Sequence, residues 1–130
     1  MSRMFFFAFF SLLLIRMQAQ SESIRTAKKY YAQEDYYHAG ILFEQLFNKV
    51  KKDKSDLLIA SKCFYESNRL DRAAEGFNLL SKSKKYRKES FRYLAQIHQY
   101  QRNFRQAIFY HKRYLSLLDR DNHERPKIYA

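Results

Sequence analysis

Residues that interrupt helices are nearly absent from this sequence. Its 130 residues include two glycines and one proline, and the proline, Pro126, stands close to the end. Glycine and proline are the residues that most often end a helix, so long helices are expected along the chain. The sequence contains neither a glycine-rich phosphate-binding loop nor the glycine-flanked serine of a nucleophile elbow.

Cysteine occurs once, at Cys63. A single cysteine excludes an internal disulfide and a paired-cysteine metal motif. Cys63 falls on the inward side of an expected helix, so we interpret it as a buried apolar thiol, with pairing to another molecule as the alternative. No motif of catalysis is found and no cofactor or metal is expected, so the sequence indicates a protein that is not an enzyme.

Acidic residues are scarce beside basic ones. Thirteen acids face 25 lysines and arginines, which gives a net charge of +12. This excess suggests an acidic partner such as an acidic protein, nucleic acid or an anionic envelope surface, and the alternative is a solvated helical surface. Two basic runs fall in expected loops and could contact anionic lipid headgroups: Lys49, Lys51, Lys52 and Lys54, then Lys82, Lys84, Lys85, Arg87 and Lys88.

The long apolar run stands at the start of the chain. Residues 4–15 are apolar except for Ser11, they follow a short basic start, and Ala19 and Ser21 are small residues at the spacing that signal peptidases use. The run is shorter than the roughly 20 residues that span a bilayer. We interpret residues 1–20 as a signal peptide, with retention as a membrane anchor as the alternative. The mature protein, still at +10, is expected in the periplasm or cell envelope, where nucleic acid is not an expected partner.

Small residues recur at intervals of 34 positions. The first set of small residues is Ala27, Ser61 and Ala95, and the second is Ala39, Ala73 and Ala107. Four residues after each member of the second set stands a bulkier residue: Phe43, Phe77 and His111. A fixed period with matching chemistry at several positions is the mark of a repeat array. We expect three units, residues 20–53, 54–87 and 88–121, and a short tail, residues 122–130.

The array resembles the tetratricopeptide repeat family, whose unit is a 34-residue helix–turn–helix. The small residue that this family has late in its first helix matches Ala27, Ser61 and Ala95, and its alanine early in the second helix matches Ala39, Ala73 and Ala107. The usual tryptophan position holds Ser23, Leu57 and Phe91, and the helix-ending proline is missing from every unit. The resemblance covers residues 20–121. It implies an all-α fold, a right-handed α-solenoid of three helix–turn–helix units, as in exported arrays of bacterial envelopes.

Hydrophobic spacing predicts where the helices lie. First helices are expected over residues 22–33, 56–67 and 89–101, and second helices over residues 36–50, 70–82 and 104–118. Polar residues separate the two helices of each pair. Asp35 and Asn103 are expected to cap the helices that follow them, and Ser55 is expected to cap the helix over 56–67.

The resemblance also implies a function, which is to bind an extended or helical segment in a concave groove lined by the first helices. The matching positions are Ile24, Lys28, Tyr31, Leu58, Lys62, Tyr65, Arg92, Gln96, Gln99 and Tyr100. Lysines beside tyrosine rings suit an acidic peptide. The sequence thus predicts a noncatalytic interaction scaffold, or alternatively a small basic protein that coats an anionic envelope surface through its loop lysines.

Two histidines of the third unit, His98 and His111, stand where the other units have aromatic rings. We expect the two positions to face each other and interpret them as a half-buried stacked pair. The alternative is a two-histidine metal or pH-sensitive site, for which no third ligand is evident.

The last expected helix carries more apolar surface than the tail can cover, on Phe109, Tyr110, Tyr114, Leu117 and Leu118. We therefore expect self-association or a partner at this helix. A strictly monomeric species in sedimentation at micromolar concentration would count against that expectation.

Overall fold

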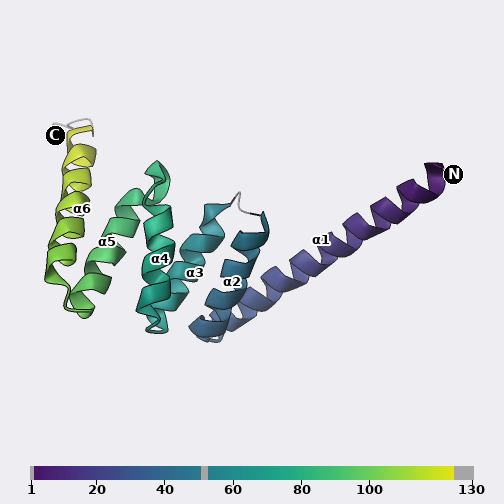
Figure 1. The fold of residues 1–130 in the computed structure, drawn as a ribbon, viewed down its shortest axis with the longest axis horizontal. Coiled ribbons are helices and arrows are strands. Elements are labelled where there is room, and N and C mark those ends of the chain that lie inside the picture. The colour runs from purple at the N-terminus through teal and green to yellow at the C-terminus, as the bar shows by residue number, and fades with distance from the viewer. Residues whose placement is uncertain (1, 51–52, 125–130) are drawn as a thin grey trace, which may run out of the picture. The chain divides into compact units, whose positions relative to one another are not determined.

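A computed structural model describes residues 2–50 and 53–124, and all regular structure in these residues is helical (Figure 1). The helices are α1 (Ser2–Ala32), α2 (Tyr36–Val50), α3 (Lys54–Glu66), α4 (Leu70–Leu80), α5 (Lys84–Tyr100) and α6 (Phe104–Glu124). The predicted all-α class is confirmed. The three second helices begin at the predicted residues, whereas α5 begins at Lys84 rather than at residue 89.

The chain forms two compact units, Met1–Cys63 and Phe64–Ala130, and the boundary between them falls inside α3. In the first unit α1 packs against α2, and in the second unit α5 packs against both α4 and α6. The two compact units do not coincide with the three predicted 34-residue repeat units, so the repeat division stays a prediction.

The same turn closes each pair of helices. Its central residue has a left-handed backbone in all three cases: Glu34 (φ 60°), Asn68 (φ 59°) and Arg102 (φ 57°). The next backbone N–H donates to the carbonyl five residues earlier: Asp35 to Tyr30 at 3.0 Å, Arg69 to Phe64 at 2.7 Å and Asn103 to His98 at 2.8 Å. This pattern satisfies carbonyls that the end of a helix leaves free. The 34-residue period of the sequence is thus also a period of backbone geometry.

A glycine in the third turn should stabilise the protein. A left-handed backbone costs a residue with a Cβ about 1–2 kcal/mol, and glycine costs about 0.5–1 kcal/mol through the entropy of the unfolded chain. Arg102→Gly should therefore raise the free energy of unfolding by about 0.5–1 kcal/mol in urea titrations. Asn68→Gly should change it little, because asparagine tolerates this conformation. Equal gains from the two substitutions would contradict backbone strain as the cause.

One of the predicted caps is seen and another is wrong. The backbone N–H of His38 donates to Asp35 Oδ1 at 3.3 Å, so Asp35 caps α2 as predicted. The His38 ring reinforces this contact, because Nδ1 lies 2.8 Å from Asp35 Oδ2, and this hydrogen bond lowers the pKa of the Asp35 carboxyl. Ser55 does not cap α3. The helix begins one residue earlier than Ser55, so Asp53 takes the cap position and accepts from the Ser55 N–H at 2.9 Å.

Small residues occupy the core positions where helices approach each other. Ala27, Ala39 and Ala73 have no exposed surface, and Ala95 is buried too. The Ser61 side chain is buried and donates to the Leu57 carbonyl at 2.7 Å, which satisfies its hydroxyl. Cys63 is buried, as predicted.

The third repeat unit, residues 88–121, departs from the predicted packing. Phe43 and Phe77 are buried, but His111, 34 residues after Phe77, is exposed and Ala107 is only half-buried. The reason is visible within the second compact unit, Phe64–Ala130. Phe77 on α4 stacks on Tyr93 of α5, with ring centroids 4.5 Å apart. His111 lies on α6, and no helix follows α6 in the described part of the chain. The expectation that His111 is a packing residue was therefore wrong.

Candidate functional site

A cavity in the first unit gathers side chains from α1, α2 and α3. Its volume is ≈ 490 Å³, and we call it the Lys28 cavity. The lining residues are Ile24, Lys28, Tyr31, Phe43, Asp56, Ile59 and Lys62. Four of the predicted groove residues, namely Ile24, Lys28, Tyr31 and Lys62, are therefore brought together at one place.

The Lys28 cavity combines an apolar lining with cationic side chains. Phe43 from α2 is buried, and Ile24 and Ile59 are half-buried. Tyr31 is 49% exposed, and its ring meets the Tyr36 ring edge-on with centroids 5.6 Å apart. Apolar contact together with two ammonium groups suits an acidic ligand that also carries apolar or aromatic side chains.

Asp56 is a cavity residue that sequence reasoning missed. Burial raises the pKa of its carboxyl, and the charge of Asp53 adds to this shift. Asp56, Ile59 and Lys62 are three residues apart, which places them on one face of α3. Leu58, which the 34-residue alignment with Ile24 predicted as a groove residue, does not line the cavity. The 34-residue period aligns Lys28 with Lys62, and both line the cavity, but beside Lys62 α3 contributes Ile59 rather than Leu58.

A second cavity, of ≈ 570 Å³, lies in the second unit and is called the Tyr100 cavity. It is lined by Gln96, Gln99, Tyr100, Arg102 and Phe104, of which the first three were predicted groove residues. Tyr65, another predicted groove residue, lies beside it. The Tyr65 ring is 5.1 Å from that of Tyr93 and 6.4 Å from that of Tyr100. Burial raises the pKa of Tyr65, and a hydrogen bond to Tyr100 adds to the shift.

The predicted groove residue Arg92 is exposed on α5 and lines neither cavity. Its guanidinium lies over the Tyr93 ring, 5.0 Å from the centroid, and Nη2 is 4.0 Å from Glu89 Oε1. Arg92 is therefore engaged on its own helix.

The two histidines of the third unit lie in different environments. The half-buried His98 ring stacks on Tyr110 of α6, with centroids 5.5 Å apart and an interplanar angle of 6°. His111 is exposed and lines a third cavity with apolar residues of α6 that include Phe104, Ile108 and Leu115. His98 therefore fills an aromatic slot as expected, but the ring it stacks on is Tyr110 and not His111.

Protonation of His98 should destabilise the fold. Its Nδ1 is buried without a hydrogen-bond partner among the described residues, and burial lowers the pKa of the ring. The unfolded chain therefore binds the proton more readily, so the neutral ring contributes fully above about pH 6.5 and its contribution is lost as the pH falls below that value. Melting temperatures between pH 7.5 and pH 5 should show this loss. His98→Phe should make the profile flatter, whereas a matched change at the exposed histidine, His111→Phe, should leave it in place.

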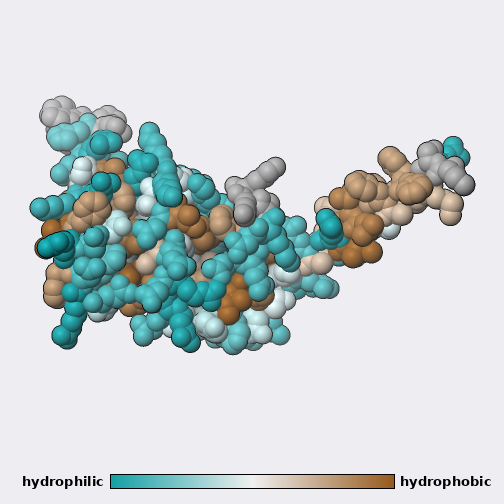
Figure 2. Space-filling model, viewed as in Figure 1, coloured by the Kyte–Doolittle hydropathy of each residue, from teal (hydrophilic) through white to brown (hydrophobic). Residues whose placement is uncertain are grey.

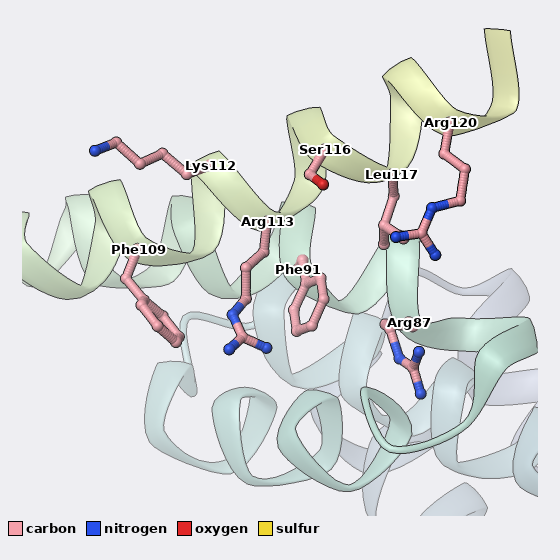
Figure 3. A pocket seen from close by; sticks show the side chains of 8 residues that line it. All are labelled: Arg87, Phe91, Phe109, Lys112, Arg113, Ser116, Leu117 and Arg120. Carbon is pink, nitrogen blue, oxygen red and sulfur yellow. The ribbon is translucent and has the colours of Figure 1, made fainter. Parts of the chain in front are cut away.

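A strongly basic pocket lies between α5 and α6 and is called the Arg113 pocket (Figure 3). Its volume is ≈ 430 Å³, and four cationic, three apolar and one hydroxyl residue line it: Arg87, Lys112, Arg113, Arg120, Phe91, Phe109, Leu117 and Ser116. A neighbouring hollow of ≈ 260 Å³ adds Lys84, Lys85, Lys88 and Asp121, and there Lys88 Nζ lies 2.6 Å from Asp121 Oδ2. Sequence reasoning placed Arg87 and these lysines in a loop, which was wrong, because they lie in the first turns of α5. It missed Arg113 and Arg120.

The first part of α1 makes little contact with the rest of the first unit. Residues 3–22 are exposed, and their apolar side chains face outward (Figure 2). The helix continues without a break through Ala19 and Ser21, the two predicted cleavage positions. By length and composition it is a candidate to cross a membrane, and a signal sequence passes the same test.

These sites offer recognition of anions and apolar groups. Within residues 2–50 and 53–124, no group of three or more histidine, cysteine, aspartate or glutamate side chains is placed to hold a metal ion. Comparison of the chain with protein-family models, with curated proteins and with solved structures finds no match.

Proposed function

We propose that this protein is a noncatalytic interaction scaffold of the tetratricopeptide type, which binds an acidic, extended or helical peptide segment. The Lys28 cavity is the proposed principal contact. Its ammonium groups meet acidic side chains of the partner, and its apolar lining takes a neighbouring apolar or aromatic side chain. The solenoid arrangement of the three helical pairs belongs to this proposal.

The observation that carries the proposal is the convergence of Ile24, Lys28, Tyr31 and Lys62 on one cavity. These residues were predicted from the tetratricopeptide resemblance, and they come from two helices separated by α2. A cavity lined by two lysines, one aspartate and apolar side chains has the mixed character of a ligand site, in which a few polar groups fix the orientation of the ligand.

Titration with a labelled acidic peptide tests this function. A peptide of alternating glutamate and tyrosine should bind and raise its fluorescence anisotropy, and the affinity should fall as salt is added because the contacts are partly exposed. A peptide of alternating lysine and tyrosine is the matched control and should not bind. Equal binding of the two peptides would contradict the proposal.

The proposed setting is the bacterial cell envelope, with residues 1–20 acting as an export signal. The exposed apolar side chains of residues 4–15 support this part of the proposal. Mass spectrometry of the mature amino terminus distinguishes cleavage after Ala19 or Ser21 from retention of the segment as an anchor.

A further inference from the structure

The Arg113 pocket has a charge that the lining side chains do not balance. Among the residues that the structure describes, four cationic residues and no carboxylate line it. Like charges that line one pocket repel each other, and a bound anion offsets that repulsion. The pocket lies within the second unit and uses none of the residues of the Lys28 cavity, so it is independent of the function proposed above.

Arg113 is held in place by two aromatic rings. Its guanidinium carbon lies 4.6 Å from the centroid of Phe109 and 5.8 Å from that of Phe91. Figure 3 shows the Arg113 side chain extending from α6 between these two rings. Stacking of this kind covers the flat faces of a guanidinium and leaves the N–H groups at its edge to donate. The group is therefore pre-organised, and binding costs it less conformational entropy.

Arg87 is fixed by a different contact. Its Nε donates to the Ser81 carbonyl at 3.0 Å, and the residue is half-buried. This hydrogen bond anchors the guanidinium through one nitrogen and leaves its two terminal nitrogens for a ligand. Arg120, from the last turns of α6, lines both the Arg113 pocket and the neighbouring hollow.

We propose that the Arg113 pocket binds a phosphate monoester. The phosphate accepts hydrogen bonds from Arg87, Arg113 and Arg120, and the organic group of the ester packs on Phe91 and Leu117. A planar guanidinium group donates two parallel hydrogen bonds to two phosphate oxygens, and a dianion with three free oxygens can accept from several arginines at once. A carboxylate has two oxygens and one charge, so it leaves part of the pocket unmatched.

Titration of the full-length protein in a neutral detergent with phenyl phosphate tests this site. The Nε–Hε signals of arginine in ¹H–¹⁵N NMR report binding directly. Phenyl phosphate should bind more tightly than inorganic phosphate, because only the ester has an apolar group, and about tenfold more tightly than benzoate. Phosphatidic acid, whose headgroup is also a phosphate monoester, added to the micelles then identifies the source. Competition with phenyl phosphate indicates a lipid headgroup, and lack of competition indicates a soluble ester, so both results support the site.

Substitutions locate the binding. Arg113→Gln should weaken phenyl phosphate binding about tenfold, as expected for loss of a charge-assisted hydrogen-bonding partner. Arg105→Gln removes the same charge from an exposed residue of the same helix outside the pocket and should change the affinity less than twofold. If Arg113→Gln fails to fold by circular dichroism, the exposed Arg120→Gln takes its place. Equal loss in the Arg105 variant, equal affinity for benzoate, or no saturation with phenyl phosphate would overturn the proposal.

Discussion

Reversing two charges, Lys28→Glu together with Lys62→Glu, should weaken binding of the glutamate–tyrosine peptide about 100-fold. Both lysines line the Lys28 cavity. Each reversal replaces an attraction with a repulsion, and about 1.4 kcal/mol per reversal corresponds to a factor of ten. We expect the loss mainly in the dissociation rate for contacts inside the cavity, and fluorescence anisotropy with stopped-flow dissociation measures both quantities.

A matched pair of reversals elsewhere controls for total charge. Lys29 and Lys49 belong to the same unit, are exposed and do not line the cavity. Lys29→Glu with Lys49→Glu should therefore leave affinity within about threefold at moderate salt, where the Debye length is near 8–10 Å. Asp56→Asn should have the opposite effect and strengthen binding, because Asp56 is the one carboxylate that lines the cavity among the described residues. Similar losses for the two lysine pairs would instead favour a protein that coats anionic surfaces through its overall charge.

Phe77→Ala should cost about 3–5 kcal/mol of unfolding free energy. The Phe77 side chain has no exposed surface and stacks on Tyr93 with an interplanar angle of 6°. Truncation removes that stacking and leaves a cavity between α4 and α5, which pack against each other in the second compact unit. Urea titration followed by circular dichroism measures the change, and the loss is large beside the 5–15 kcal/mol typical of a whole domain.

His111→Ala provides the comparison at the same position of the 34-residue period. His111 is exposed, so its truncation should change the unfolding free energy by less than about 0.5 kcal/mol. Sequence periodicity alone treats Phe77 and His111 as equivalent, and only the structure separates them. A loss of several kcal/mol in the His111 variant would mean that another surface covers α6 in solution, as the expected self-association requires.

The helices could be predicted from the sequence because their signals are local. Tyr36, Leu70 and Phe104 each begin a helix after a polar turn, and the 34-residue repetition predicted these three starts correctly. The burial of Ala39 and Ala73 followed from the same pattern, since a small side chain every 34 residues marks a close helix approach.

The details that failed depend on contacts between helices. Packing between helices sets which face α3 turns toward the Lys28 cavity. The sequence therefore predicted Leu58 as a lining residue, whereas Asp56 and Ile59 line the cavity. The burial of an aromatic slot depends on whether another helix follows, which is why His111 differs from Phe77. Arg113 and Arg120 escaped notice because they belong to no basic run, and α6 brings them next to Arg87 of α5 only in the folded chain.

The uninterrupted course of α1 bears on the proposed removal of residues 1–20. A peptidase must bind its substrate as an extended strand, so removal of residues 1–20 requires the helix to unwind locally around Ala19 and Ser21. In the intact helix the Ser21 and Ser23 hydroxyls donate to the carbonyls of Gln18 and Ala19. Cleavage after Ala19 would leave both serines at the new helix start, and cleavage after Ser21 would leave Ser23 there. Serine at a helix start caps free N–H groups, and Glu22 complements the helix dipole. The shortened chain would thus keep a well-terminated first helix.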